Sequence, residues 1–351
     1  MKKGLLGSSA LIGATVLMAG VASAAEAPTW KLTGNANFQF YYVDQDSTSE
    51  TVQEHGWYFG VDESELQLNV SGTADNGLNY GFKIEIQTNT TDNTVADEVR
   101  LQLSGTWGTV QMGDEDGAED IMNYGGENLM GATGGFDGDY DDALAYTWYP
   151  TMAGDTSDHT KVSYFSPRFS GFQVGASLTP QPGLDGDDFK EDGDWENAIG
   201  LGANYDNSFG DLRIRASAVY ATVSSTNTGT EDKAAWSVGG IVGWGPASLG
   251  ANYTDNGDSG VDVGDDENSS YWNVAGSFET GPMYFSVGYM SALYEEDADY
   301  EFEYTHIALT ADYTVAPGLS VYAEYNIQEV SETGGWSHDA SLFIAGANIS
   351  F

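Results

Sequence analysis

Carboxylates are the side chains whose number and spacing most clearly suggest chemistry in this sequence. The chain has 54 Asp and Glu residues against 11 Lys and Arg, which gives a formal net charge of −43 at pH 7. So large a negative excess excludes a protein that follows nucleic-acid phosphates with basic residues. It indicates that cations, whether free ions, metals or positively charged solutes, are the natural partners.

One acidic stretch, "DGDYDD", suggests calcium binding. Asp137, Asp139 and Asp141 occupy the first, third and fifth positions of an EF-hand loop. Asp142 stands where that loop needs glycine, and Trp148 stands where it needs glutamate. The EF-hand pattern therefore fails, and a different carboxylate site for calcium and a solvated acidic loop both stay open.

A second acidic stretch, "DNGDSGVDVGDDEN", also fails as an EF-hand, because Gly257 occupies its third position. Asp255, Asp258 and Asp262 remain as candidate calcium ligands. The alternative is again a solvated loop, with divalent cations bridging it to anionic lipid headgroups. No other cofactor is indicated.

Enzyme chemistry has little support in the sequence. There is no G-x-S-x-G, H-E-x-x-H or Walker A motif, and there is no cysteine. The histidines, at 55, 159, 306 and 338, lie far apart and have no companion pattern. We therefore expect no catalytic site.

Four of the few basic residues alternate with apolar neighbours. Successive side chains of a β-strand point to opposite faces, so all four would share the polar face of their strands. They could form a basic wall, or neutralise nearby acids such as Glu85 and Glu98. The four residues are Lys83, Arg100, Arg213 and Arg215.

The elements that must position these side chains are β-strands. In residues 78–87, "LNYGFKIEIQ", apolar and polar residues alternate strictly, and the same period of two recurs along the chain. Many runs are longer than the five or six residues usual in globular proteins. Sixteen strands are expected, near 31–43, 61–73, 78–89, 97–104, 109–114, 160–166, 171–179, 197–206, 211–223, 234–244, 247–255, 270–279, 283–294, 302–315, 319–330 and 339–351.

The connections between these strands alternate in length. Short ones that carry Gly or Pro, such as "ADNG" and "APG", alternate with mostly longer acidic ones. A soluble β-sandwich gives no reason for loop lengths to segregate in this way, whereas outer-membrane barrels have short turns at one end and long loops at the other. The sequence therefore predicts an all-β fold, a transmembrane antiparallel up-and-down barrel of 16 strands.

The sequence resembles the sixteen-stranded trimeric general diffusion porins of Gram-negative outer membranes, most closely those of alphaproteobacteria. The resemblance is clearest in "LQLSGTWGTVQMGDEDGAED" (101–120), in "KVSYFSPRFSGFQVGASLTP" (161–180) and in the terminal Phe351. It implies a homotrimer in the outer membrane. It also implies that the terminal aromatic residue is an assembly signal, read by the machinery that inserts barrels.

The connection at 115–159 is the third long one. In the porins that this chain resembles, the third loop folds into the lumen and forms the constriction, here opposite the basic wall. The alternative is a surface loop exposed to solvent. The candidate acids of the constriction are Glu115, Asp116, Glu119, Asp120, Glu127, Asp137, Asp139, Asp141 and Asp142.

The favoured function is a water-filled channel for passive diffusion of small hydrophilic solutes and ions, with a mild preference for cations because acids outnumber bases. One alternative is a substrate-specific porin that uses Phe165, Tyr284 and Tyr322 as an aromatic track. Another is a plugged structural or adhesive barrel. Outer-membrane lipid is the expected surrounding partner, and nucleic acid is not expected.

The first 24 residues have the pattern of a cleaved secretory signal. Lys2 and Lys3 precede an apolar stretch, and the small residues 22–24 form a cleavage site. We expect residues 25–351 to form a single barrel domain exported to the outer membrane.

Overall fold

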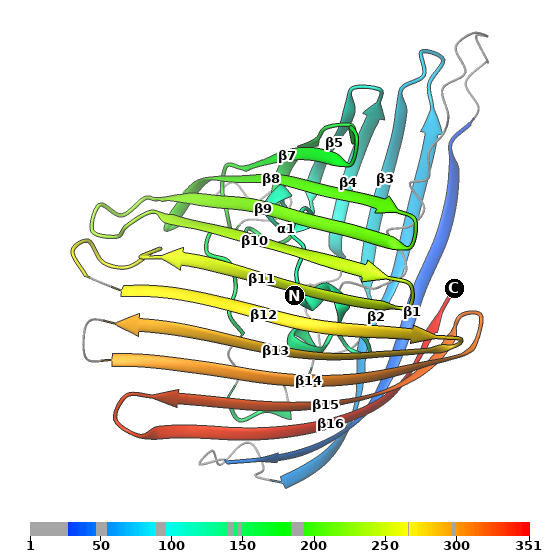
Figure 1. Ribbon diagram of the computed structural model, residues 1–351. Coiled ribbons are helices and arrows are strands. Elements are labelled where there is room, and N and C mark those ends of the chain that lie inside the picture. Colours follow the sequence, from blue (N-terminus) through cyan, green and yellow to red (C-terminus); the bar gives the residue numbers. More distant parts are fainter. Residues whose placement is uncertain are drawn as a thin grey trace.

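The fold is a single closed β-barrel (Figure 1). The computed structural model describes residues 27–46, 55–88, 96–138, 140, 143–146, 149–183, 193–265, 267–296 and 300–351, so the expected signal at 1–24 lies outside the described residues. The strands are β1 (Thr29–Gln45), β2 (His55–Thr73), β3 (Asn79–Gln87), β4 (Ala96–Gly105), β5 (Gly108–Asp114), β6 (Thr160–Phe165), β7 (Phe172–Thr179), β8 (Trp195–Phe209), β9 (Leu212–Ser225), β10 (Lys233–Trp244), β11 (Ala247–Gly257), β12 (Glu267–Thr280), β13 (Met283–Glu296), β14 (Tyr300–Ala316), β15 (Leu319–Glu332) and β16 (Trp336–Ser350).

All sixteen predicted strands are confirmed. Each strand pairs antiparallel with its neighbours in sequence, and β1 pairs with both β2 and β16. The largest difference is at β2, which begins at His55 rather than at residue 61. There Trp57 and Phe59 continue the outward apolar row, opposite Tyr42 and Phe40 of β1.

The two faces of the wall differ in character, as the period of two requires. On β16, Phe343 and Ile349 are exposed on one face, while Leu342 and Ile344 are buried on the other. Exposed apolar side chains recur in the same way on the other strands. An apolar exterior suits hydrocarbon, and a closed barrel leaves no unpaired strand edge in it. The structure has no helix among its described residues that is long and apolar enough to span a membrane.

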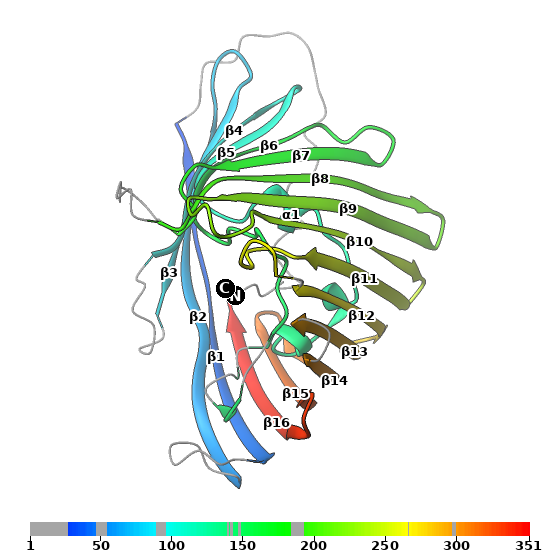
Figure 2. The ribbon, with the colours of Figure 1, turned by 90° about the vertical axis from the view of Figure 1, so that its left-hand side faces the viewer.

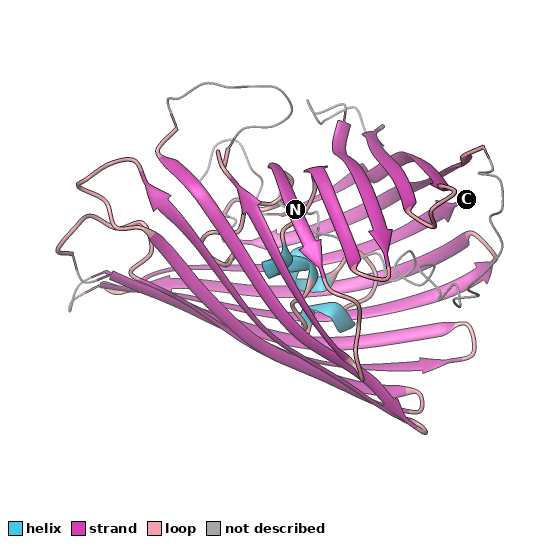
Figure 3. Ribbon diagram, turned by 90° about the horizontal axis from the view of Figure 1, so that it is seen from above, coloured by secondary structure: helices cyan, strands magenta, loops and turns pink. Residues whose placement is uncertain are grey.

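Three short helices belong to the long connection between β5 and β6. They are α1 (Ala118–Ile121), η2 (Glu127–Leu129) and η3 (Gly135–Asp137), and both Figure 2 and Figure 3 draw them within the ring of strands. Apolar residues of this connection pack against residues of the barrel wall. Phe136 belongs to a buried cluster with Met290, and Leu144 to one with Leu342 and Ile344.

The pairing of β1 with β16 closes the barrel, and Phe351 extends this seam by one residue. The amide of Phe351 donates to the carbonyl of Gly34 at 3.0 Å, and the amide of Gly34 donates back at 3.1 Å. A Cβ at Gly34 would lie 2.5 Å from the carbonyl oxygen of Glu65, so a glycine is needed where the terminus meets β1.

Deletion of Phe351 is expected to lower the yield of folded barrel several-fold and to leave the conductance of the folded fraction unchanged. The deletion removes two backbone hydrogen bonds at the seam and no polar side chain of the inner face. The mobility shift between heated and unheated samples on a gel measures the yield. Phe351→Leu, which keeps the backbone bonds, is the control, and a normal yield from the deletion would leave Phe351 with no role in assembly.

Candidate functional site

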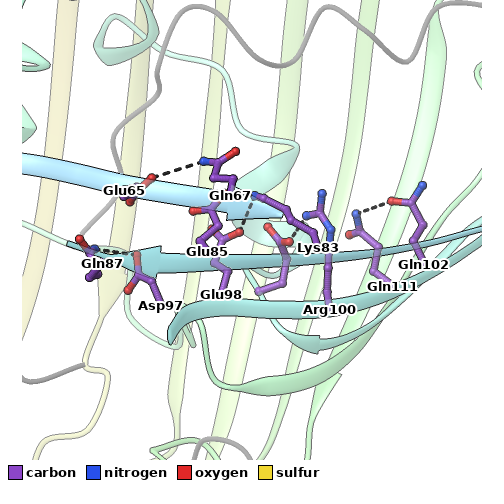
Figure 4. A network of polar contacts seen from close by, with 11 residues as sticks. Glu65, Gln67, Lys83, Glu85, Gln87, Asp97, Glu98, Arg100, Gln102 and Gln111 are labelled. Atoms are coloured by element: carbon purple, nitrogen blue, oxygen red, sulfur yellow. Dashed lines mark hydrogen bonds and ion pairs between the residues drawn. The ribbon is translucent and has the colours of Figure 1, made fainter. Parts of the chain in front are cut away.

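A ladder of charged and amide side chains covers the inner face of β2–β5 (Figure 4). Lys83 Nζ lies 2.7 Å from Glu98 Oε2 and forms a second ion pair with Glu85. Gln67 Nε2 donates to Glu65 Oε2 at 3.3 Å. This part of the inner wall therefore presents mostly carboxylate and amide groups, with few cations among them.

A β-bulge adds a carboxylate to this face. The register between β3 and β4 shifts between Ile84 and Ile86, so that Glu85 faces two residues of β4, Asp97 and Glu98. A bulge inserts one extra residue and so re-aims side chains. Strict alternation along the sequence places Glu98 on the inner face and Asp97 on the outer face. It missed the inward position of Asp97, because a bulge cannot be recognised from the alternation of residues.

Two groups of three carboxylates converge here, and oxygen atoms within each group lie within 4.8 Å of one another. Such oxygen-rich groups are the ligand type that Ca²⁺ prefers. Lys83 already provides a positive charge to Glu85 and Glu98. The groups are Glu65 with Glu85 and Asp97, and Glu98 with Asp116 and Asp158.

The calcium ligands expected from the sequence are not members of these two groups. Asp139, Asp141 and Asp142 lie outside the described residues, as does the side chain of Asp137. Asp255, Asp258 and Asp262 do not form a convergent group of three among the described carboxylates. Instead Asp255 Oδ1 accepts the backbone N–H of Gly257 at 3.0 Å, which is a local turn contact.

The four basic residues form two separate pairs rather than one contiguous wall. Lys83 on β3 faces Arg100 on β4, and Arg100 forms an ion pair with Glu115. The other pair, Arg213 and Arg215, lies on β9. Lys83 has the other role that the sequence left open, since it pairs with Glu85 and Glu98.

The two arginines of β9 have different partners. Arg213 binds the carboxylate of Asp206 through Nε at 2.9 Å and through a terminal nitrogen at 2.6 Å. The guanidinium of Arg215 lies 5.4 Å from the ring centre of Tyr124, in the long connection. Arg215 thus lies next to that connection.

The ends of the 115–159 connection are held by a buried lysine. Lys161, whose side chain is only 3% exposed, donates hydrogen bonds to the backbone carbonyls of both Glu115 and Ser157. Glu119, in α1, is buried and accepts a hydrogen bond from Ser177 Oγ at 2.9 Å. The sequence did not predict that Lys161 holds the connection. Its only sign there is that Lys161 alternates with apolar neighbours.

Further along, side chains of the wall bind backbone amides of the same connection. The acceptors lie on β9 and on β12 to β15, so the connection is held at several points along this part of the wall. The amide-to-acceptor distances are 2.8 Å for Tyr124 to Ser217, 2.8 Å for Gly126 to Asn273, 3.1 Å for Gly131 to Ser286, 3.0 Å for Ala132 to Asp312 and 3.0 Å for Thr133 to Glu324. Of the remaining predicted acids, Glu127 accepts from Asn273 Nδ2 at 3.2 Å, and Asp120 lies in α1.

The aromatic residues proposed as a track do not form one. Phe165 and Tyr322 are each 7% exposed and belong to buried clusters. Tyr284 donates its hydroxyl to the carbonyl of Leu129 at 2.7 Å. These three rings pack the long connection against the wall, and the alternative of an aromatic track loses its basis.

A closed barrel of sixteen antiparallel strands with an apolar exterior and a polar inner face is the architecture of an outer-membrane channel. The profile of the Gram-negative porin family matches residues 8–333. The chain therefore belongs to the Gram-negative porin family, and it is a multi-pass barrel of the outer membrane.

Solved structures have the same fold. OmpT of Vibrio cholerae, folded in vitro and in trimer form, matches with a TM-score of 0.67 at 17% identity, over 93% of this chain and 100% of that one. The anion-selective porin of Comamonas acidovorans matches with a TM-score of 0.63 at 17% identity, over 93% and 100%. A mutant of the Rh. blastica porin matches with a TM-score of 0.58 at 17% identity, over 92% and 100%. No curated protein sequence matches the chain significantly.

Asp158 is expected to make the barrel less stable as pH rises through 6. Burial, with Glu98 and Asp97 nearby, raises the pKa of its carboxyl from 3.8 to about 6. Between these values the folded state binds more protons than the unfolded state, so the stabilising contribution present below pH 4 is lost by pH 7. Asp158→Asn should raise the free energy of unfolding at pH 7 by about 1 kcal/mol, allowing for solvent screening, and change little at pH 4.

Urea unfolding in detergent at both pH values measures this difference. Asp258→Asn removes the same charge from an exposed position and is the matched control. An equal effect of both substitutions would show that net charge, and not the environment of Asp158, is responsible.

Proposed function

We propose that this barrel conducts small hydrophilic solutes and ions by passive diffusion, with a mild preference for cations. The observation that carries the proposal is the inner face of β2–β5, where four carboxylates accompany two cations. Carboxylates along a pore concentrate cations and repel anions. The acids are Glu65, Glu85, Asp97 and Glu98, and the cations are Lys83 and Arg100.

We further propose that the connection at 115–159 narrows the lumen. Its hydrogen bonds to the inner side chains of many strands support this, since they hold a chain segment against the inner wall. The carboxylates of β2–β5 and Arg215 beside Tyr124 would then lie along the path of a solute. Their opposite charges would orient dipolar solutes.

A homotrimer is the assembly that we propose. Strands β5, β6 and β7 have 7, 6 and 8 residues, whereas a strand that spans a bilayer needs about 9–11. A wall with such short strands is better covered by neighbouring copies than by lipid. The trimer form of OmpT supports the same assembly. Lipid and lipopolysaccharide would surround the rest of the exterior.

In a KCl gradient the reversal potential is expected to show a potassium-to-chloride permeability ratio above one. Asp97→Asn combined with Glu98→Gln should bring this ratio closer to one, because it removes two carboxylates from the inner face. Planar bilayer recording provides the measurement, and Glu301→Gln together with Asp258→Asn, both at exposed positions, is the charge-matched control. A native ratio below one would contradict the proposed selectivity.

Single-channel insertion events are expected to carry three conductance steps each. Chemical cross-linking in detergent should give a ladder that ends at three copies. Single, independent steps together with a monomer on cross-linking would contradict the trimer and leave the channel itself intact.

A further inference from the structure

Two carboxylates of the barrel wall hold adjacent peptide groups of the long connection. Glu324 Oε2, on β15, accepts the backbone N–H of Thr133 at 3.0 Å and its hydroxyl at 2.7 Å. Asp312, on β14, accepts the backbone N–H of Ala132 at 3.0 and 3.1 Å through its two oxygens. The turn at these two residues is thus bound at consecutive positions.

Glu324 is buried, with 1% of its surface exposed, and no Lys, Arg or His among the described residues forms an ion pair with it. Its second oxygen, Oε1, accepts Asn326 Nδ2 at 2.8 Å. Both oxygens therefore act as acceptors, which an ionised carboxylate provides and an amide does not. A buried acid without a cation needs such donors to compensate for lost hydration.

The same network continues to a buried histidine. Asn326 Oδ1 lies 2.9 Å from His306 Nε2, and the hydroxyl of Tyr304 lies 3.0 Å from His306 Nδ1. A neutral imidazole with its proton on Nε2 satisfies both contacts. The orientation of Asn326 is then determined, because its oxygen faces a donor and its nitrogen faces Glu324.

The histidine end of this network also contacts the long connection. The rings of Phe136 and Tyr140 lie 5.4 and 6.3 Å from the ring of His306, both in edge contact. The network of Glu324, Asn326 and His306 therefore reaches the connection on both sides of η3.

We propose that Glu324 is a positioning residue that holds the long connection at one distance from the wall and so sets the open width of the channel. This inference rests on the proposed role of the connection in narrowing the lumen. Glu324 acts through Thr133 and does not itself contact the solute. Asn326 and His306 fix the direction of its hydrogen bonds.

Glu324→Gln tests the need for two acceptor oxygens. With Asn326 and His306 in their native orientation and tautomer, the amide nitrogen faces a donor at either Thr133 or Asn326, so one bond breaks. The fraction of molecules in which the connection is displaced from the wall should rise roughly tenfold, which is the usual effect of leaving a buried polar group without a hydrogen bond. Single-channel records should then show extra conductance levels, and amide hydrogen exchange around Thr133 should become faster.

The double variant E324Q/N326D is the matched rescue. It exchanges amide and carboxylate between the two positions without changing the length of either side chain. The new amide can donate to the new carboxylate, which can still accept from His306, so every bond of the network has a counterpart. Native conductance levels and native exchange around Thr133 are expected. If Glu324 had a merely structural role, any defect would loosen the barrel. The double variant would then show at least as many extra conductance levels and at least as fast an exchange around Thr133 as the single variant.

If E324Q fails to fold, Thr133→Val replaces it in the exchange measurement, because it removes the hydroxyl that donates to Glu324 and should likewise make exchange around Thr133 faster.

Native conductance levels and native exchange in E324Q would overturn the inference, as would a folded E324Q/N326D that is no better than the single variant. Failure of the proposed channel function can be distinguished from failure of the inference about Glu324. If the native protein does not conduct, the channel proposal fails whatever Glu324 does. If exchange around Thr133 responds to E324Q while conductance does not, Glu324 holds the connection but the connection does not set the width.

Discussion

Pairing of every backbone N–H and C=O group is the constraint on which the rest of this structure depends. Water cannot satisfy these groups inside a bilayer, so a sheet there must close on itself. The chain meets this requirement by pairing β1 with β16, where Phe351 and Gly34 exchange backbone hydrogen bonds. The closed ring then gives every side chain one of two environments, the lipid outside or the enclosed space inside.

The division into two faces explains the composition of the chain. Its 54 acidic residues and its exposed aromatic residues are compatible with one fold because alternate positions separate them. On β2–β5 the inner face gathers carboxylates around Lys83 and Arg100. The proposed cation preference therefore depends on which acids lie inside, not on the net charge of the molecule.

The long connection is held in one way near its ends and in another way at the turn near Thr133. Near its ends a cation, Lys161, binds backbone carbonyls, and Arg100 pairs with Glu115. Around the turn near Thr133, carboxylates bind backbone amides instead. The charged groups that bind the backbone thus each meet the opposite end of a peptide dipole, which helps a segment with little regular structure to be buried.

The sequence alone determined the sixteen strands, the outward row that includes Phe343 and Ile349, and the alternation of short and long connections, because these follow from local periodicity and turn residues. Only the tertiary structure decided which distant residues meet. The bulge that turns Asp97 inward, the separation of Arg213 and Arg215 from Lys83 and Arg100, the burial of Glu324, and the inward apolar pair Leu342 and Ile344 all depend on register and on the path of one long connection. Hydrogen-bond register between strands far apart in sequence leaves no local pattern, so the residues by themselves could not have revealed it.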